Sequence, residues 1–350
     1  MPAQTLSFRR QVLETGVSAK SVHIADFNGD GKADVAVLNT GELDMGSVAV
    51  MLRTSTGFSA PVVTSTGGIA AWSMATGDFN QDGKMDVAVV NNASGNVSIM
   101  LGNGDGTFRI GGYYATHLSP NAITAADLNG DGHLDLAVVN GGSGDLTILL
   151  GKGNGTFTTG ASIYLGSSPT DVVAADFNAD GIQDLAVTNG VLGLQVVVVL
   201  LGNGDGSFRV GQSLNTDNEP IALVAGQFSQ NGKADLAVAN LVSNDISLLA
   251  GAGNGTFQPA VSYSTGNGPS GIAAADFNRD SKLDLVVCND VSNNVSVYLG
   301  HGDGTFQPAI SLATGSSPTS IAVGDLNHDG RRDIATAGPE GVVLLLNTTH

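Results

Sequence analysis

The feature that most constrains this chain is a nine-residue acidic stretch that occurs seven times. Its first copy, DFNGDGKAD, spans residues 26–34, and further copies begin at residues 78, 127, 176, 227, 276 and 325. A repeat period of about 50 residues is typical of propellers and other repeat arrays. Because the copies are spread over all 350 residues, the whole chain has to fold as one array of similar units.

Each repeat contains four short apolar segments separated by clusters of Gly, Asn, Asp and Ser. In the sixth repeat they are SGIAAA (270–275), LVVCN (285–289), NVSVYLG (294–300) and a segment within GTFQPAISLATG (304–315). Such short runs rich in Val, Ile and Leu indicate strands, which we call a to d. One four-stranded antiparallel sheet per repeat predicts an all-β fold, a single seven-bladed β-propeller over residues 1–350.

Two features predict that the sheets close into a ring. Strand a is rich in small residues, as in TDVVAAD (170–176), which suits the crowded innermost position of a blade. The last repeat ends with GVVLLLNTTH (341–350) and has no strand d, whereas LSFRRQVLETG (6–16) matches strand d of other repeats. We therefore expect the N-terminal strand to complete the seventh blade.

The acidic stretch connects strands a and b, and its pattern is typical of a calcium loop. Positions 1, 3, 5 and 9 carry Asp, Asn, Asp and Asp in six copies, usually with glycine at position 6. Ca²⁺ prefers several hard oxygen ligands, and glycine allows the sharp bend between them. In the first loop the carbonyl of Lys32 is the expected backbone ligand. The predicted side-chain ligands are Asp26, Asn28, Asp30, Asp34; Asp78, Asn80, Asp82, Asp86; Asp127, Asn129, Asp131, Asp135; Asp176, Asn178, Asp180, Asp184; Asp276, Asn278, Asp280, Asp284; and Asp325, Asn327, Asp329, Asp333.

Two copies depart from the pattern. The fifth, QFSQNGKAD (227–235), keeps only the carboxylate of Asp235, so we expect no metal there. The sixth has Ser281 at the bend, which costs about 1 kcal/mol if this residue needs a positive φ, and we expect weaker binding. The sequence thus predicts about six calcium ions that pin the a-to-b hairpins. Extracellular modules bind calcium at about millimolar levels, which favours an extracellular or cell-surface location.

The stretches DFNGDGKADVAV (26–37) and LGNGDGTF (101–108) resemble FG-GAP or VCBS repeats. Such repeats build the integrin α-chain propeller and seven-bladed fungal and bacterial lectins, and the resemblance covers essentially the whole chain. It implies calcium on the face away from the ligand. It does not identify the ligand, because this fold hosts many functions.

Composition argues against two classes of partner. The net charge is −18 with only 14 Lys and Arg residues, so we expect neither nucleic acid nor an anionic membrane surface as a partner. No apolar run reaches 18 residues, so we expect no membrane insertion. The N-terminal MPAQTLSFRR lacks the apolar middle of a signal peptide, so we expect any export signal to lie in a segment outside this sequence. Cys288, the only cysteine, lies in an apolar run and is expected to be a buried hydrophobe.

Candidate ligand-binding residues lie on the face opposite the calcium loops. Trp72 and the group Tyr113, Tyr114 and His117 either form aromatic platforms or pack as ordinary strand residues. The long connection 39–47 is a candidate contact loop. Asparagines end strand b in six repeats, where they either bind sugar hydroxyls or start turns. They are Asn39, Asn91, Asn140, Asn189, Asn240 and Asn289.

Catalysis finds little support in the sequence. The six histidines fall at unrelated repeat positions, and nearly all aspartates belong to the calcium loops. The GNGDGT turns (102–107) connect strands and do not open a helix, as a phosphate loop would. We therefore expect a non-catalytic binding module, most simply a glycan-binding protein with several similar inter-blade sites. An integrin-like protein-binding or adhesion module and a polysaccharide lyase-type enzyme are the two alternatives.

Overall fold

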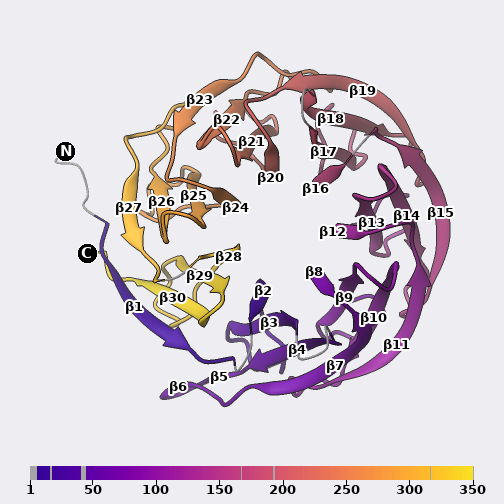
Figure 1. Ribbon diagram of the computed structural model, residues 1–350, viewed down its shortest axis with the longest axis vertical. Helices are drawn as coiled ribbons and strands as arrows, with labels where there is room; N and C mark the ends of the chain where they lie inside the picture. Colours follow the sequence, from indigo (N-terminus) through magenta and orange to yellow (C-terminus); the bar gives the residue numbers. More distant parts are fainter. Residues whose placement is uncertain are drawn as a thin grey trace.

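The computed structural model describes residues 6–15, 18–40, 45–166, 168–191, 194–315 and 317–349. These residues form the predicted ring of seven four-stranded antiparallel sheets, which confirms the seven-bladed β-propeller (Figure 1). They contain no helix that could cross a membrane.

In six blades the strands run outward from the central axis in chain order. These blades are β2 (Ala19–Ala25), β3 (Asp34–Thr40), β4 (Met45–Met51) and β7 (Val62–Ile69); β8 (Ala71–Gly77), β9 (Asp86–Asn91), β10 (Asn96–Gly102) and β11 (Phe108–Ala115); β12 (Pro120–Ala126), β13 (Asp135–Asn140), β14 (Asp145–Gly151) and β15 (Phe157–Tyr164); β16 (Pro169–Ala175), β17 (Asp184–Val191), β18 (Leu194–Gly202) and β19 (Phe208–Asn215); β20 (Pro220–Gly226), β21 (Asp235–Asn240), β22 (Asp245–Leu249) and β23 (Val261–Ser264); and β24 (Pro269–Ala275), β25 (Asp284–Asn289), β26 (Asn294–Tyr298) and β27 (Ile310–Ala313). A small hairpin of β5 (Arg53–Thr54) and β6 (Gly57–Phe58) extends the first blade.

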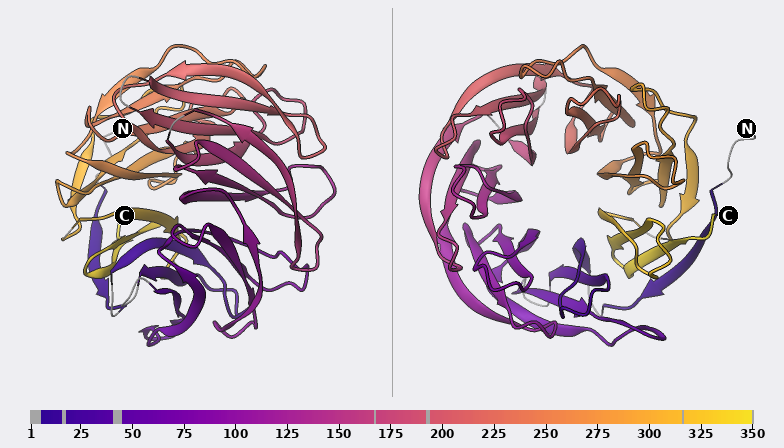
Figure 2. Two further views of the ribbon diagram at one scale, coloured as in Figure 1. Left: turned by 45° about the vertical axis from the view of Figure 1, so that its right-hand side comes forward. Right: turned by 180° about the vertical axis from the view of Figure 1, so that it is seen from behind.

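The seventh blade closes the ring with strands from both ends of the chain. It contains β28 (Ser320–Gly324), β29 (Asp333–Gly338), β30 (Gly341–Asn347) and, outermost, β1 (Phe8–Leu13). β1 pairs antiparallel with β30, from Phe8 opposite Asn347 to Leu13 opposite Val342. Figure 2 shows this indigo strand along the edge of the yellow C-terminal blade. The predicted closure is confirmed.

The core lies between neighbouring blades. Strand b is buried along its length, and Cys288 on β25 is fully buried, as expected. Phe27, at the second position of the first acidic loop, packs edge-on against Phe108 of the next blade, with ring centroids 6.1 Å apart. The same contact joins Phe277 to Phe8 across the closure, at 6.4 Å. Such ring contacts fix five of the acidic loops against the next blade.

The antiparallel order gives the propeller two different faces. The a-to-b loops and c-to-d turns lie together on one face, which we call the loop face. There the N–H of Gly106 in the second blade donates to the carbonyl of Phe27 in the first, at 3.2 Å. The b-to-c and d-to-a connections lie on the opposite face. Innermost strands therefore begin at the opposite face and end at an acidic loop.

In six blades the innermost strand contains a β-bulge at its second residue. In β12, for example, Pro120 pairs with Asn140 and Ala122 with Val139, so the residue between them has no partner on β13. A bulge re-aims the side chain of the extra residue. The residues at this bulge position are Lys20, Trp72, Asn121, Thr170, Ile221 and Ser270.

Candidate functional site

Each intact acidic loop wraps around the carboxylate at its first position. In the first loop, Asp26 Oδ2 accepts the N–H of Gly31 at 2.7 Å, and Asp26 Oδ1 accepts the N–H of Gly29 at 2.7 Å. Asn28 Oδ1 accepts the N–H of Asp30 at 3.0 Å. The bond from position 6 to position 1 recurs in the other five loops that begin with aspartate. The structure thus brings positions 1, 3 and 5 of each predicted ligand set into one tight turn.

The aspartate at position 9 has a structural role that the sequence analysis missed. Asp34 is fully buried. Its Oδ2 accepts the N–H of Phe27 at 2.9 Å, and its Oδ1 accepts the N–H of Arg53, after strand c, at 2.6 Å. Equivalent pairs of bonds occur at Asp86, Asp135, Asp184, Asp284 and Asp333. Each of these carboxylates fastens its loop to the end of strand c.

Asp235 shows that this role does not require the other loop carboxylates. The fifth loop has neutral residues at positions 1, 3 and 5. Asp235 is nevertheless 1% exposed, and its Oδ1 accepts the N–H of Gly251 at 2.8 Å. Its Oδ2 accepts both the N–H and the hydroxyl of Ser229, at 2.9 and 2.8 Å. The one carboxylate that this loop retains is therefore the one that accepts backbone N–H groups.

The sixth loop holds Ser281 in a left-handed conformation, with φ of 64°. The glycine at the same position of the first loop, Gly31, has φ of 79°. The Ser281 N–H still donates to Asp276 Oδ2 at 2.8 Å, so the loop keeps the common shape. A side chain in this region is strained, which is the condition under which the sequence analysis expected weaker binding.

The donor set of the six intact loops fits Ca²⁺, because each supplies three carboxylates and an amide oxygen within nine residues. In the described residues, however, no three Asp, Glu, His or Cys side chains are gathered into a metal-holding cluster. The loop carboxylate and amide oxygens instead accept backbone N–H groups. Because each carboxylate oxygen has two lone pairs, it can accept a hydrogen bond and also bind a cation. Burial raises the pKa of Asp86 to about 6, and repulsion from Asp82 and Asp78 adds to it. A bound cation would relieve that repulsion.

The asparagines at the ends of strand b form no exposed ring of amides. Asn39, Asn91 and Asn140 are at most 1% exposed. Asn91 Nδ2 donates to Asn96 Oδ1 at 2.8 Å and to Ser98 Oγ at 2.7 Å, both on strand c. Asn140 makes equivalent bonds in its own blade. This burial contradicts the ligand-binding role predicted for Asn39, Asn91 and Asn140. The amides of Asn91 and Asn140 instead close their b-to-c hairpins from inside.

The predicted tyrosine platform lies on the outer strand β11, away from the central axis (Figure 1). Tyr114 is partly buried and packs edge-on against Phe157 of the next blade, with centroids 5.4 Å apart, so it is a packing residue. Tyr113 is 50% exposed and lies beside Gly67. His117 Nδ1 lies 2.6 Å from Asp145 Oδ2. Residues 41–44 of the candidate contact loop lie outside the described residues.

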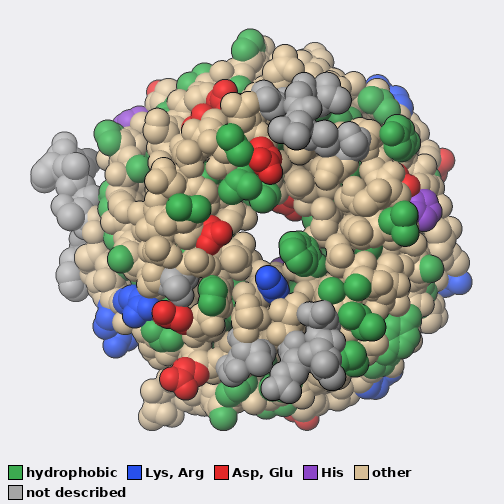
Figure 3. All heavy atoms as spheres, viewed as in Figure 1, with side chains coloured by type: hydrophobic (Ala, Val, Ile, Leu, Met, Phe, Trp, Pro, Cys, Tyr) green, Lys and Arg blue, Asp and Glu red, His purple; other side chains and the backbone are tan. Residues whose placement is uncertain are grey.

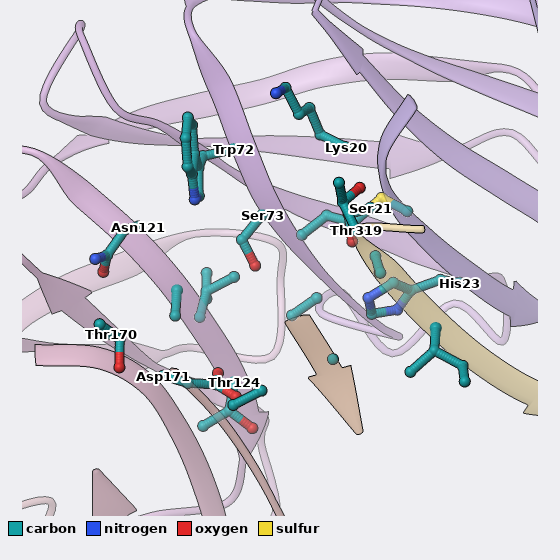
Figure 4. A pocket seen from close by; sticks show the side chains of 18 of the residues that line it. Lys20, Ser21, His23, Trp72, Ser73, Asn121, Thr124, Thr170, Asp171 and Thr319 are labelled. Atoms are coloured by element: carbon teal, nitrogen blue, oxygen red, sulfur yellow. The ribbon is translucent and has the colours of Figure 1, made fainter. Parts of the chain in front are cut away.

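A central pocket of about 660 Å³ is lined by the innermost strands of all seven blades. Its volume is within the range of small-molecule sites. Figure 3 shows the opening of the ring with hydrophobic, basic and acidic side chains near its rim. Figure 4 shows that hydroxyl groups of Ser73, Thr124 and Thr170 also line this pocket. The bulge residues stand at its mouth, on the face opposite the acidic loops.

Three bulge residues join neighbouring blades. The side chains of Asn121, Thr170 and Ser270 each donate a hydrogen bond to the next blade. The acceptor is the backbone carbonyl of the proline just before or at the start of its innermost strand, at 3.0, 3.0 and 2.7 Å. Trp72 makes no such bond, and Asn92 Nδ2 takes over the contact to Pro120 of the next blade at 3.0 Å. The ring is therefore joined at this blade without Trp72.

Trp72 and Lys20 come from adjacent blades and meet at the pocket mouth. Trp72, the second residue of β8, is 50% exposed, and the Lys20 ammonium lies 5.3 Å from its ring centroid (Figure 4). Trp72 is among the predicted ligand-binding residues, whereas Lys20 is not. The signal for Lys20 in the sequence is that the sixth residue before each acidic loop varies chemically, whereas the residue before it is Ala or Pro in every repeat.

The two other titratable groups in the pocket are bonded to the protein. Asp171 Oδ1 accepts the N–H of Val172 at 2.9 Å, and its Oδ2 accepts the N–H of Leu223 in the next blade at 3.1 Å. Burial raises the pKa of Asp171 to about 7. His23 Nδ1 lies 3.3 Å from the Thr76 hydroxyl, and burial lowers its pKa to about 4, so the ring is neutral at pH 7.

A family model described as FG-GAP-like repeat matches residues 26–89, 78–138, 127–187, 228–287 and 276–336, together more than half of the chain. The chain belongs to the FG-GAP repeat family. Four of the five matches begin at the first residue of an acidic loop, so the loops that define the ring also define the family. The FG-GAP resemblance is thereby confirmed. No match was found among curated proteins.

Solved structures share the FG-GAP propeller's fold at low identity. BBS1N, solved in complex with ARL6DN and soaked with lead, is 12% identical with a TM-score of 0.68, covering 99% of this chain and 97% of its own. A putative 6-phosphogluconolactonase from Bacteroides uniformis is 14% identical with a TM-score of 0.66, covering 84% and 86%. One from Bacteroides fragilis is 16% identical with a TM-score of 0.65, covering 86% of both chains. These likenesses concern the fold alone.

The fifth loop provides a test of the position 9 aspartate. Asp235→Asn replaces one accepting oxygen with an NH₂ group that faces a buried donor, so we expect a loss of about 3 kcal/mol in the free energy of unfolding. Urea unfolding, with and without EDTA, measures it. Glu340→Gln, at an exposed carboxylate 3.9 Å from Arg10, serves as the control and should change little. A loss below about 1 kcal/mol, or one that disappears in EDTA, contradicts the assignment.

The strained bend of the sixth loop provides a second test. Ser281→Gly removes a side chain from a residue with φ of 64°, so we expect a gain of about 1 kcal/mol in unfolding free energy. Ala174→Gly, within β16 at an ordinary φ, should instead lose about 1 kcal/mol because glycine costs backbone entropy there. Urea unfolding of both variants measures the difference. Equal losses in the two would show that Ser281 is not strained.

Proposed function

We propose that this FG-GAP propeller is a non-catalytic, extracellular binding module that calcium stabilises at the loop face and that binds a glycan in the central pocket. Trp72 carries this proposal. It is a half-exposed indole at the mouth of a pocket, in a position where Asn121, Thr170 and Ser270 instead join neighbouring blades. A sugar ring presents an apolar face to such a platform, and its hydroxyls suit the surrounding polar side chains.

The pocket supports one glycan site per chain, in place of the several inter-blade sites expected from the repeats. Its bulge residues differ from blade to blade, so the seven blades do not offer equivalent contacts. The asparagines that do repeat are buried. A single asymmetric pocket favours recognition of one saccharide end or one short segment.

A non-catalytic role is supported by the bonds within the pocket. General acid–base chemistry needs a titratable group that can reach the ligand and exchange a proton with it. Both oxygens of Asp171 accept backbone N–H groups, and the imidazole of His23 is neutral and faces Thr76. These groups are suited to holding the pocket walls.

Two observations support calcium at the loop face. Each intact loop supplies three carboxylates and an amide oxygen, and these carboxylates repel one another. When bound, the ion would supply positive charge among three carboxylates and cross-link the turn that joins strands a and b. Its binding to the folded chain stabilises the fold by about 2.7 kcal/mol per site at a 100-fold excess over Kd. Calcium loops of extracellular modules operate at about millimolar concentration, which supports a location outside the cell.

The calcium proposal predicts about six bound ions, with none in loop 227–235. Native mass spectrometry should count them, and chelation should lower the thermal unfolding midpoint. The triple variant Gln227→Asp, Ser229→Asn and Asn231→Asp gives the fifth loop the ligand pattern of the second, DFNQDGKMD, so it should bind one more ion. No bound metal, together with a midpoint that EDTA leaves unchanged, would contradict calcium stabilisation.

The glycan proposal predicts that Trp72→Ala weakens saccharide binding about tenfold or more, because a stacked aromatic face is lost. A glycan array at saturating calcium should first identify a binding saccharide, and titration then gives the affinities. Tyr164→Ala removes an aromatic ring that is 76% exposed on β15 and should leave binding unchanged. Tyr113→Ala tests the outer platform. A blank array, or equal binding by wild type and Trp72→Ala, would overturn the proposed site.

A further inference from the structure

We propose that the ligand of the central pocket is an anionic saccharide, whose acidic group pairs with Lys20 while its ring stacks against Trp72. This inference rests on the proposed glycan-binding function and specifies its ligand class. The chemistry that Lys20 recognises is a negative group, which a sugar carboxylate, sulfate or phosphate can supply. Trp72 supplies the flat surface that a bare anion would not need.

The Lys20 ammonium has no anionic partner in the described part of the chain. The other half-buried lysines, Lys32 and Lys282, lie 2.8 and 3.8 Å from the carboxylates of Asp30 and Asp280. For Lys20 the only interaction found among the described residues is the one with the Trp72 ring. The chain has 32 acidic residues and only 14 basic ones, yet Lys20 forms no ion pair with a described carboxylate. Its ammonium group is therefore free to pair with a ligand.

The position of Lys20 in the repeat argues against a purely structural role. It occupies the bulge position, where the other blades have neutral residues, and three of these join neighbouring blades. The bulge directs this side chain toward the pocket mouth, where Figure 4 shows it beside Trp72. Lys20 is also half-buried, and a charge pair in such surroundings is less screened than one at the open surface.

Among the described residues that line the pocket, Asp171 is the only carboxylate, and it forms no ion pair with Lys20. Asp171 lies in the fourth blade, and its oxygens accept the N–H groups of Val172 and Leu223. Its role resembles that of Ser320, whose hydroxyl accepts the N–H of Val22 in the next blade at 3.3 Å. The positive charge at the mouth is therefore left for a ligand, and the hydroxyls of Ser73 and Thr124 remain to contact sugar hydroxyls (Figure 4).

Titration calorimetry of the calcium-loaded protein tests this inference with matched saccharides. The probes are a galacturonic acid oligosaccharide, its carboxyl-reduced neutral counterpart, a sulfated disaccharide and a hexose 6-phosphate. We expect at least one anionic probe to bind about tenfold or more tightly than the neutral one. Added salt should reduce this preference. The comparison among the three anionic probes identifies the acidic group.

Three lysine variants assign the preference to its residue. Lys20→Gln should lower the affinity for the anionic probe to that for the neutral one, whereas Lys20→Arg should keep the anionic probe's advantage. Lys152→Gln, at an exposed lysine of a c-to-d turn on the loop face, should bind like the wild type. Retained anion preference in Lys20→Gln would overturn the role of Lys20.

The failure of this inference can be distinguished from the failure of the glycan proposal. If neutral and anionic saccharides bind equally and Trp72→Ala weakens both, the glycan site stands and the anionic class is wrong. If no saccharide binds but an acidic peptide does, and Lys20→Gln abolishes that binding, both proposals are overturned in favour of a protein-binding propeller. Formation of unsaturated products from the galacturonic acid probe would overturn the non-catalytic assignment.

Discussion

The rest of the propeller depends on the hydrogen bonds that the buried aspartate at position 9 of each acidic loop accepts. Its two oxygens accept N–H groups from the loop and from the end of strand c, as Asp34 does with Phe27 and Arg53. A buried carboxylate is costly unless it is fully hydrogen-bonded, so these N–H groups and the carboxylate require one another. The fixed loop then places Phe27 against Phe108 of the next blade, and repetition of this contact builds the ring.

The repeated contacts leave the two faces free for different tasks. At the loop face, positions 1, 3 and 5 concentrate negative charge that the fold itself does not need, as the neutral fifth loop shows. At the opposite face, the bulge frees one residue from strand pairing in each of six blades, so this residue can vary without disturbing the sheet. We propose that metal binding at the acidic loops supplies stability, and that a few unrepeated residues at the pocket mouth supply recognition.

The sequence predicts those parts of the structure that repeat along the chain. The period, the four strands and the closing role of residues 6–16 follow from local patterns and are confirmed by the blades and by the pairing of β1 with β30. The sequence could not show whether Asn91 points outward, because that depends on how strand b packs between blades. Nor could it show the bulge that exposes Trp72 and Lys20, because a bulge exists only in the register between two strands.

The proposed metal binding and the proposed recognition occupy opposite faces of one ring. A crystal structure of the calcium-loaded protein with a bound acidic oligosaccharide, collected for anomalous scattering, tests this arrangement most directly. We predict anomalous peaks in the six intact loops, none at 227–235, and saccharide density between Trp72 and Lys20. Loops without peaks, or saccharide density confined to the outer strands between blades, would contradict the claim.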